Sequence, residues 1–186
     1  MFLECISDHA NSLHFALNNN LSKTRKLVLV ALLSSVGAIL QSTGGFLLGV
    51  GFFLSPLATA PIIFCSIISN FFSFYSYILT ILLLVILQPS ELLVFTFTTG
   101  MLGIGIGISF RYFKRRIYII LMGMAVLSIG IFILLYILKF PILGSTIPTS
   151  FQTKNVLSIL LFTFMYSWVW VEISYTSFRK LKTYLN

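Results

Sequence analysis

The sequence predicts an all-α membrane protein, a bundle of six transmembrane helices. Apolar residues make up 58% of the 186-residue chain, and charged residues only 9%. The mean hydropathy is +1.03. A soluble domain carries about 25% charged residues, so this chain has too little polar surface to cover a water-facing globule. Its long apolar runs are separated by short basic clusters, which is typical of helices that cross a bilayer repeatedly.

The first apolar run, residues 27–110, predicts four membrane spans. A helix needs about 20 apolar residues to cross a bilayer, and this run contains a single charged residue, Glu91. Basic clusters lie before it at 23–26 and after it at 111–116. If both clusters are cytoplasmic, the number of crossings between them is even, and two crossings would be far too long. Local helix breakers place the spans at 27–42, 46–68, 71–88 and 92–110.

Two further apolar runs predict the fifth and sixth spans, at 117–138 and 156–177. The segment between them, 139–155, combines proline, glycine and polar residues and predicts an outer loop. This topology leaves every basic residue except Lys139 and Lys154 on the cytoplasmic side. We therefore expect a multi-pass protein of the cell membrane with both termini in the cytoplasm.

The expected organisation is one membrane domain, residues 23–178, between two short cytoplasmic segments. The segment 1–22 lacks the continuous apolar core of a signal peptide. Part of it, residues 3–17, has spacing compatible with an amphipathic helix on the membrane surface. The basic tail covers 179–186.

The chain offers few groups for chemistry within the bilayer. It has no histidine after residue 14 and no aspartate after residue 8. Acid–base or metal-dependent catalysis would require such groups at membrane depth. A Walker motif is also missing, so the chain does not use ATP by itself. We expect no enzyme activity, no cofactor and no metal site, and we interpret the basic clusters as orientation signals rather than a nucleic-acid surface.

Small residues in two spans predict close helix packing. The four glycines between 100 and 107 lie in an expected membrane helix, which favours a helix-packing face over a phosphate loop. In span one, Ala31 and Ser35 lie one turn apart, as do Ser34 and Ala38. These two strips predict either packing inside the bundle or contact with a partner helix.

Other features interrupt the apolar pattern. Glycines and prolines between 49 and 61 predict that span two is either a broken helix lining a cavity or an ordinary kinked helix. Glu91 begins span four, where a helix N-terminus favours an anion. This position suggests either a cap or a ligand for a cationic solute. Glu172, toward the inner end of span six, is expected near cytoplasmic basic residues.

Taken in order, these features resemble a known family. A basic N-terminus precedes Lys26-Leu-Val-Leu-Val-Ala-Leu-Leu-Ser-Ser-Val-Gly-Ala, and a later segment reads Pro89-Ser-Glu-Leu-Leu-Val-Phe-Thr-Phe-Thr-Thr-Gly-Met-Leu-Gly-Ile-Gly-Ile-Gly. Over residues 23–178 this layout resembles the substrate-binding S components of energy-coupling-factor (ECF) vitamin transporters and their six-span relatives. The resemblance implies binding of a vitamin-like solute from the outer face. It also implies a transmembrane coupling subunit and ATPase subunits as partners, besides membrane lipid.

The resemblance also implies two sets of site residues. The coupling subunit would contact Ala31 and Ser35, with serine in place of the family's second alanine, and the adjacent strip is Ser34 and Ala38. The solute would bind at the outer loops and outer halves of spans four to six, through the following expected residues: Glu91, Tyr136, Lys139, Gln152 and Asn155.

Two alternatives remain at this point. One is a non-catalytic membrane scaffold resembling the small rod-shape-determining membrane proteins, although their Gly-rich segment followed by Asp is missing here. The other is a membrane enzyme, for which buried ionisable groups are lacking.

Overall fold

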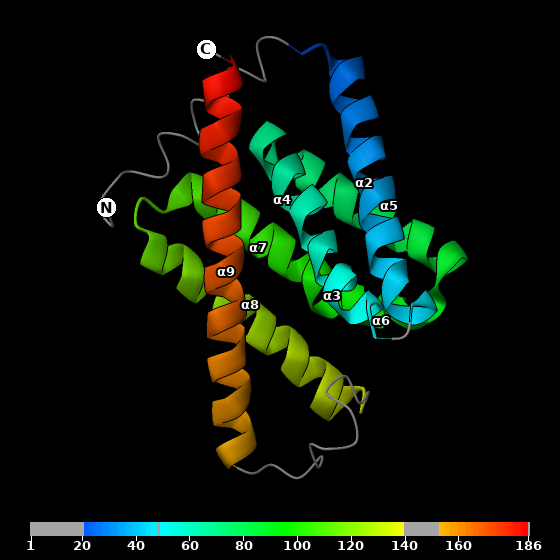
Figure 1. Cartoon of the computed structure of the whole chain (residues 1–186), viewed down its shortest axis with the longest axis vertical. Helices are drawn as coiled ribbons and strands as arrows, with labels where there is room; N and C mark the ends of the chain where they lie inside the picture. Colours follow the sequence, from blue (N-terminus) through cyan, green and yellow to red (C-terminus); the bar gives the residue numbers. More distant parts are fainter. Residues whose placement is uncertain (1–20, 48, 140–152, 186) are drawn as a thin grey trace.

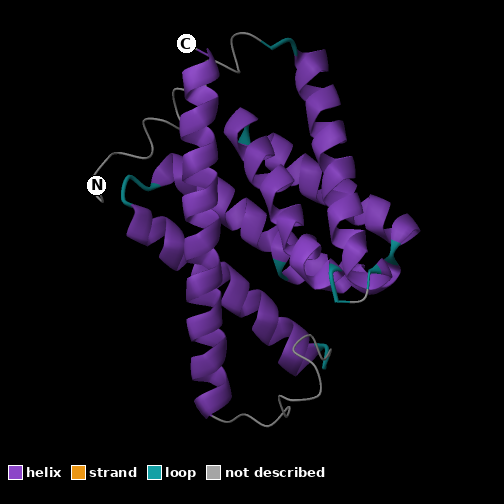
Figure 2. Ribbon diagram, viewed as in Figure 1, coloured by secondary structure: helices purple, strands orange, loops and turns teal. Residues whose placement is uncertain are grey.

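The computed structural model is a bundle of helices and describes residues 21–47, 49–139 and 153–185 (Figures 1 and 2). The described part contains no strand. This confirms the all-α fold class. Its elements are α2 (Lys23–Phe46), α3 (Gly51–Leu54), η1 (Ser55–Ala58), α4 (Thr59–Ile68), α5 (Asn70–Leu87), α6 (Pro89–Phe97), α7 (Thr99–Tyr112), α8 (Arg116–Phe132), η2 (Ile133–Ile137) and α9 (Thr153–Leu185).

Five helical segments are long and apolar enough to cross a membrane: α2, α5, α6 with α7, α8 with η2, and α9. Their outward faces keep large apolar side chains exposed, such as Leu32 at 63%, Ile86 at 81% and Leu161 at 67%. Exposing this much apolar surface to water costs free energy, whereas contact with lipid does not. The chain is therefore a membrane protein.

The second predicted span, 46–68, is shorter than expected. Its apolar helix covers Ser55–Ile68, or about 21 Å at 1.5 Å per residue, less than the roughly 30 Å hydrocarbon core. The chain turns before this helix at Gly49, whose φ of 83° favours glycine. Pro56 lies in the first turn of η1. Proline is tolerated there, because the backbone N–H groups of a first turn have no hydrogen-bond partner within the helix. Five of the six expected spans thus have full length.

Two other helix boundaries differ from the predictions. The predicted turn after residue 42 is wrong, since α2 continues to Phe46 and Thr43 Oγ1 donates to the Leu40 carbonyl within the helix at 2.6 Å. At the other end of the chain, α9 begins at Thr153 and runs through Leu185. Part of the predicted outer loop and most of the predicted tail are therefore helical. The possible amphipathic helix at 3–17 lies outside the described residues.

The glycine face of span four is confirmed as a packing surface. A Cβ at Gly103 would lie 2.9 Å from Ile62 Cβ, and Gly107 faces Ser66 even more closely. Both neighbours belong to α4, and α4 and α7 pack along their length. The short α4 is thereby held between α2, α5 and α7. Ile62, Ile63 and Cys65 of α4 are at most 1% exposed.

The two ends of the bundle have different character. The start of α2, the junction between α4 and α5, and the end of α7 meet in one pocket, lined by Lys23, Asn70 and Arg111 among others. We call this the basic end. Both basic clusters, 23–26 and 111–116, have residues at this pocket. The chain between them therefore runs back and forth an even number of times. The C-terminal part of α2, η1 and the start of α6 form the opposite end, which we call the Glu91 end. In Figure 1, α2 begins and α9 ends at the upper side of the molecule.

Candidate functional site

A polar cluster interrupts the apolar interior at the Glu91 end. Gln41 of α2 is fully buried at its centre. Gln41 Nε2 donates to Ser55 Oγ at 2.8 Å and to Glu91 Oε2 at 2.9 Å. Thr99 Oγ1 donates to Gln41 Oε1 at 2.8 Å. We call Gln41, Ser55, Glu91 and Thr99 the Glu91 cluster.

Each member of the Glu91 cluster comes from a different element: α2, η1, α6 and α7. An amide side chain has two N–H donors and one acceptor oxygen, and the Gln41 amide uses both kinds of group here. Hydrogen bonds in surroundings of low dielectric are electrostatically stronger than in water. The cluster therefore ties four segments together at a fixed spacing.

Glu91 lies in the first turn of α6, next to Pro89 at the first helical position. The partial positive charge of a helix N-terminus stabilises a carboxylate at that position. Gly44 of α2 makes room for it, because a Cβ at Gly44 would lie 2.9 Å from Glu91 Cδ and Oε1. Within the described part of the chain, the hydrogen bond of the carboxylate is made through Oε2 to Gln41. The other oxygen, Oε1, can accept from a further donor.

The helices around this cluster are interrupted. Thr98, with φ −116° and ψ −87°, separates α6 from α7. Tyr77 Oη donates to the Thr96 carbonyl beside this break at 3.0 Å, and Gly130 of α8 lies against the Phe97 carbonyl with no space for a side chain. Further breaks are the 3₁₀ segment η1 and the π-helical segment η2. Irregular backbone at membrane depth is tolerated where other protein buries it or where it lines a cavity.

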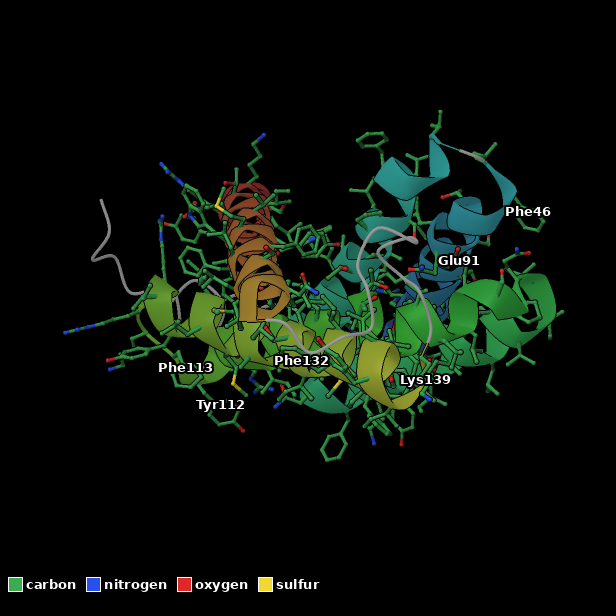
Figure 3. The ribbon with its side chains drawn as sticks, turned by 90° about the horizontal axis from the view of Figure 1, so that it is seen from below. Phe46, Glu91, Tyr112, Phe113, Phe132 and Lys139 are labelled. Atoms are coloured by element: carbon green, nitrogen blue, oxygen red, sulfur yellow. The ribbon has the colours of Figure 1, made fainter. Side chains whose placement is uncertain are left out.

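The residues predicted to bind solute do not form one group in the described contacts. Tyr136 lies in η2 and stacks on Phe132, with ring centroids 5.8 Å apart. Lys139 is exposed just after η2 with a φ of 51°, and Asn155 is half-buried in the first turn of α9. Gln152 lies outside the described residues. No described hydrogen bond joins Glu91 to Tyr136, Lys139 or Asn155, and Figure 3 shows Glu91 beside the end of α2 that carries Phe46.

Sequence reasoning missed Gln41, Ser55 and Thr99 as companions of Glu91. Gln41 was predicted to lie at the very end of the first span, 27–42, where a polar side chain next to a turn needs no explanation. Had α2 been extended through Gly44 and Gly45, a glutamine inside an apolar helix would have required a buried partner. That requirement is the signal that could have identified it.

The two small-residue strips of α2 have different surroundings. Ala38 is fully buried, and the buried Ser34 Oγ donates to Ser76 Oγ of α5 at 2.9 Å. Ala31 and Ser35 are exposed instead, and Ser35 Oγ donates to the Ala31 carbonyl of its own helix at 3.0 Å. One strip is thus internal packing, and the other remains accessible to a second helix.

Glu172 pairs with a basic residue, as expected. Arg116 Nη1 lies 3.0 Å from Glu172 Oε1, and the Arg116 guanidinium lies 4.2 Å from the centre of the Tyr175 ring. Arg116 is 12% exposed and Glu172 38% exposed. The pair joins the start of α8 to α9, which gives this acid a structural role.

The described residues include no group of three or more His, Cys, Asp or Glu side chains placed to hold a metal ion. The Glu91 cluster instead presents a half-buried carboxylate whose second oxygen, Oε1, can accept a further hydrogen bond. Such a group can bind a cation or a hydrogen-bond donor. Comparisons with protein families, with curated proteins and with solved structures find no match for this chain.

Proposed function

We propose that this protein binds a small, vitamin-like solute within the membrane, as the substrate-binding subunit of an uptake system like the ECF transporters. A separate transmembrane coupling protein and ATPases would supply the energy. The observation that carries the proposal is the Glu91 carboxylate, which is held in an apolar bundle by the fully buried Gln41.

Two physical arguments support a solute at the Glu91 cluster. An ionisable side chain within a membrane domain costs free energy and is typically found along solute or ion paths. Small-molecule sites are mostly apolar with a few well-placed polar groups, and the Glu91 cluster supplies such polar groups inside an apolar bundle. Glu91 Oε1 would accept a hydrogen bond from the solute, and its charge favours a solute with a cationic nitrogen.

The exposed strip of α2 supports a partner subunit. Ala31 and Ser35 leave little side-chain bulk on that face, so another helix can approach the α2 backbone closely. The opposite strip already packs inside the bundle, which leaves the exposed strip for contacts with other chains.

Native mass spectrometry of the gently purified protein tests the solute site. We expect wild-type protein to retain a small molecule and Glu91→Gln to reduce that retention about ten-fold or more, because the negative charge that strengthens the hydrogen bond to the solute is lost. Glu172→Gln is the matched control, since it removes the same charge at a distance from the cluster. Asn155→Ala reports whether the start of α9 contributes. Unchanged retention in a folded Glu91→Gln variant would remove the Glu91 cluster as the solute site.

Copurification separates the transport subunit from the scaffold. A transport subunit should bring down a membrane coupling protein with ATPases, whereas a scaffold should bring down cell-wall or division proteins. Ala31→Leu and Ser35→Leu should weaken either association while leaving the bundle folded. Val36→Leu, an exposed position of α2 outside this strip, is the control. Normal copurification by both strip variants would mean that Ala31 and Ser35 face lipid only.

A further inference from the structure

The basic end of the bundle contains an open pocket of about 660 Å³. Three cationic side chains reach it from two helices: Lys23 and Lys26 from the beginning of α2, and Arg111 from the last turn of α7. Among the residues that the structure describes, no acidic side chain lines it. The rest of the lining is polar at the α4–α5 junction and apolar elsewhere, consisting of Ser69, Asn70, Leu27, Ile68, Phe71 and Phe72.

The position of each cation favours binding of an anion between them. Lys26 is only 7% exposed, so its charge lies in surroundings where electrostatic attraction is stronger than in water. Arg111 Nη1 donates to Asn70 Oδ1 at 3.2 Å, which helps to orient the guanidinium at the pocket. Three cationic side chains that line one pocket attract an anion more strongly than a single one would.

The apolar part of the lining indicates what kind of anion fits. Phe71 is 77% exposed and Leu27 is 56% exposed, and both continue from the pocket onto the outer surface of the bundle. A small soluble anion would make no favourable contact with these apolar side chains. A phospholipid needs both parts, because its phosphate requires cations and its glycerol and acyl chains require apolar contact.

We propose that this pocket binds the phosphate headgroup of an anionic phospholipid. The acyl chains then lie along α2 and α5, past Leu27 and Phe71. This site lies at the opposite end of α2 from the Glu91 cluster and is independent of the solute proposed there. Basic pockets between membrane helices commonly hold anionic headgroups, and a volume of this size lies within the range of ligand pockets.

The test is titration of the delipidated full-length protein in a neutral detergent, followed by native mass spectrometry. The probes are phosphatidylglycerol, phosphatidylcholine and soluble glycerol phosphate. We expect phosphatidylglycerol to bind most tightly. Lys23→Gln and Arg111→Gln should each weaken it about five-fold, the effect of one basic residue near an anionic lipid surface. Arg111→Lys retains the charge and should retain most of the binding.

Arg25→Gln and Lys114→Gln are the matched controls. Both residues are exposed, lie close in sequence to the pocket residues and do not line it, so their variants should bind phosphatidylglycerol like wild type. Equal loss in these controls would show diffuse attraction rather than a site. Equal binding of phosphatidylcholine, or equally tight binding of glycerol phosphate, would overturn the assignment to an anionic lipid.

Discussion

The two ends of α2 collect polar side chains in opposite ways. At the Glu91 end, Gln41 donates to and accepts from side chains of three other elements, and the Glu91 cluster is largely closed to solvent. At the basic end, Lys23, Lys26 and Arg111 bring charges of one sign to an open pocket. A helix of 24 residues, about 36 Å long, separates the two.

This difference indicates which end supports the fold without a ligand. Complementary donors and acceptors stabilise one another, and removing one of them leaves its buried partners unsatisfied. The three cationic groups at the basic end do not stabilise one another in this way. The Glu91 cluster should therefore matter for the stability of the isolated protein, whereas the basic pocket should matter when an anion is present.

The largest effect is expected for Gln41→Leu. This change leaves Ser55, Glu91 and Thr99 without the amide that contacts all three. Loss of hydrogen bonds to buried groups, one of them charged, should lower the free energy of unfolding by about 2–4 kcal/mol. The measurement is the unfolding midpoint in a mixed-micelle denaturant titration.

A double variant sharpens this test. In Gln41→Leu/Glu91→Leu the carboxylate that lost its partner is also removed, so part of the lost stability should return. If the two effects simply add, Gln41 and Glu91 are not coupled, and the contrast between the two ends of α2 fails.

The fold class follows from sequence because membrane helices depend on simple physical requirements. Apolar length and basic clusters are local properties, and α5 at Asn70–Leu87 matches its predicted span at 71–88 within one residue. The second span was less accurate, since its true length depends on packing against α2 and α7. A short helix held by neighbours on several sides does not need the full length of an isolated span.

The candidate site was only partly predictable. Glu91 is a rare charge in an apolar run, so composition alone draws attention to it. Its contact with Gln41 joins residues 50 positions apart, and Gly44 of α2 leaves the room that the carboxylate occupies. Burial likewise distinguishes Ser34 from Ser35 although both strips have the same spacing. Which face a neighbouring helix covers is a tertiary property that spacing does not contain.

Two glycines of α2 provide the second prediction. A Cβ at Gly44 would crowd the Glu91 carboxylate, whereas a Cβ at Gly37 would lie 3.6 Å or more from its neighbours. Gly44→Ala should therefore destabilise by about 1 kcal/mol, and Gly37→Ala should be neutral or stabilise by up to about 1 kcal/mol through helix propensity. Both are measured by the same unfolding titration. Equal effects would mean that the Glu91 carboxylate moves aside at no cost.

The third prediction concerns a paired charge near the α7–α8 junction. Arg116→Met removes the ion pair with Glu172 and the contact with the Tyr175 ring. Because Glu172 is 38% exposed, water compensates it in part, and the expected loss of stability is about 1 kcal/mol. The unfolding midpoint should fall less than for Gln41→Leu. A larger fall would place a main stabilising contact outside the Glu91 cluster.

The smallest effect on stability is expected for Lys23→Gln. Lys23 is exposed at the start of α2, and its loss reduces repulsion among like charges, so the unfolding midpoint in lipid-free micelles should not fall. A ligand that binds the folded state stabilises it according to its affinity and concentration. Added phosphatidylglycerol should therefore raise the wild-type midpoint more than that of the variant, while Arg25→Gln responds like wild type. If Lys23→Gln lowered the unfolding midpoint in lipid-free micelles as much as Gln41→Leu does, both ends of α2 would support the fold in the same way.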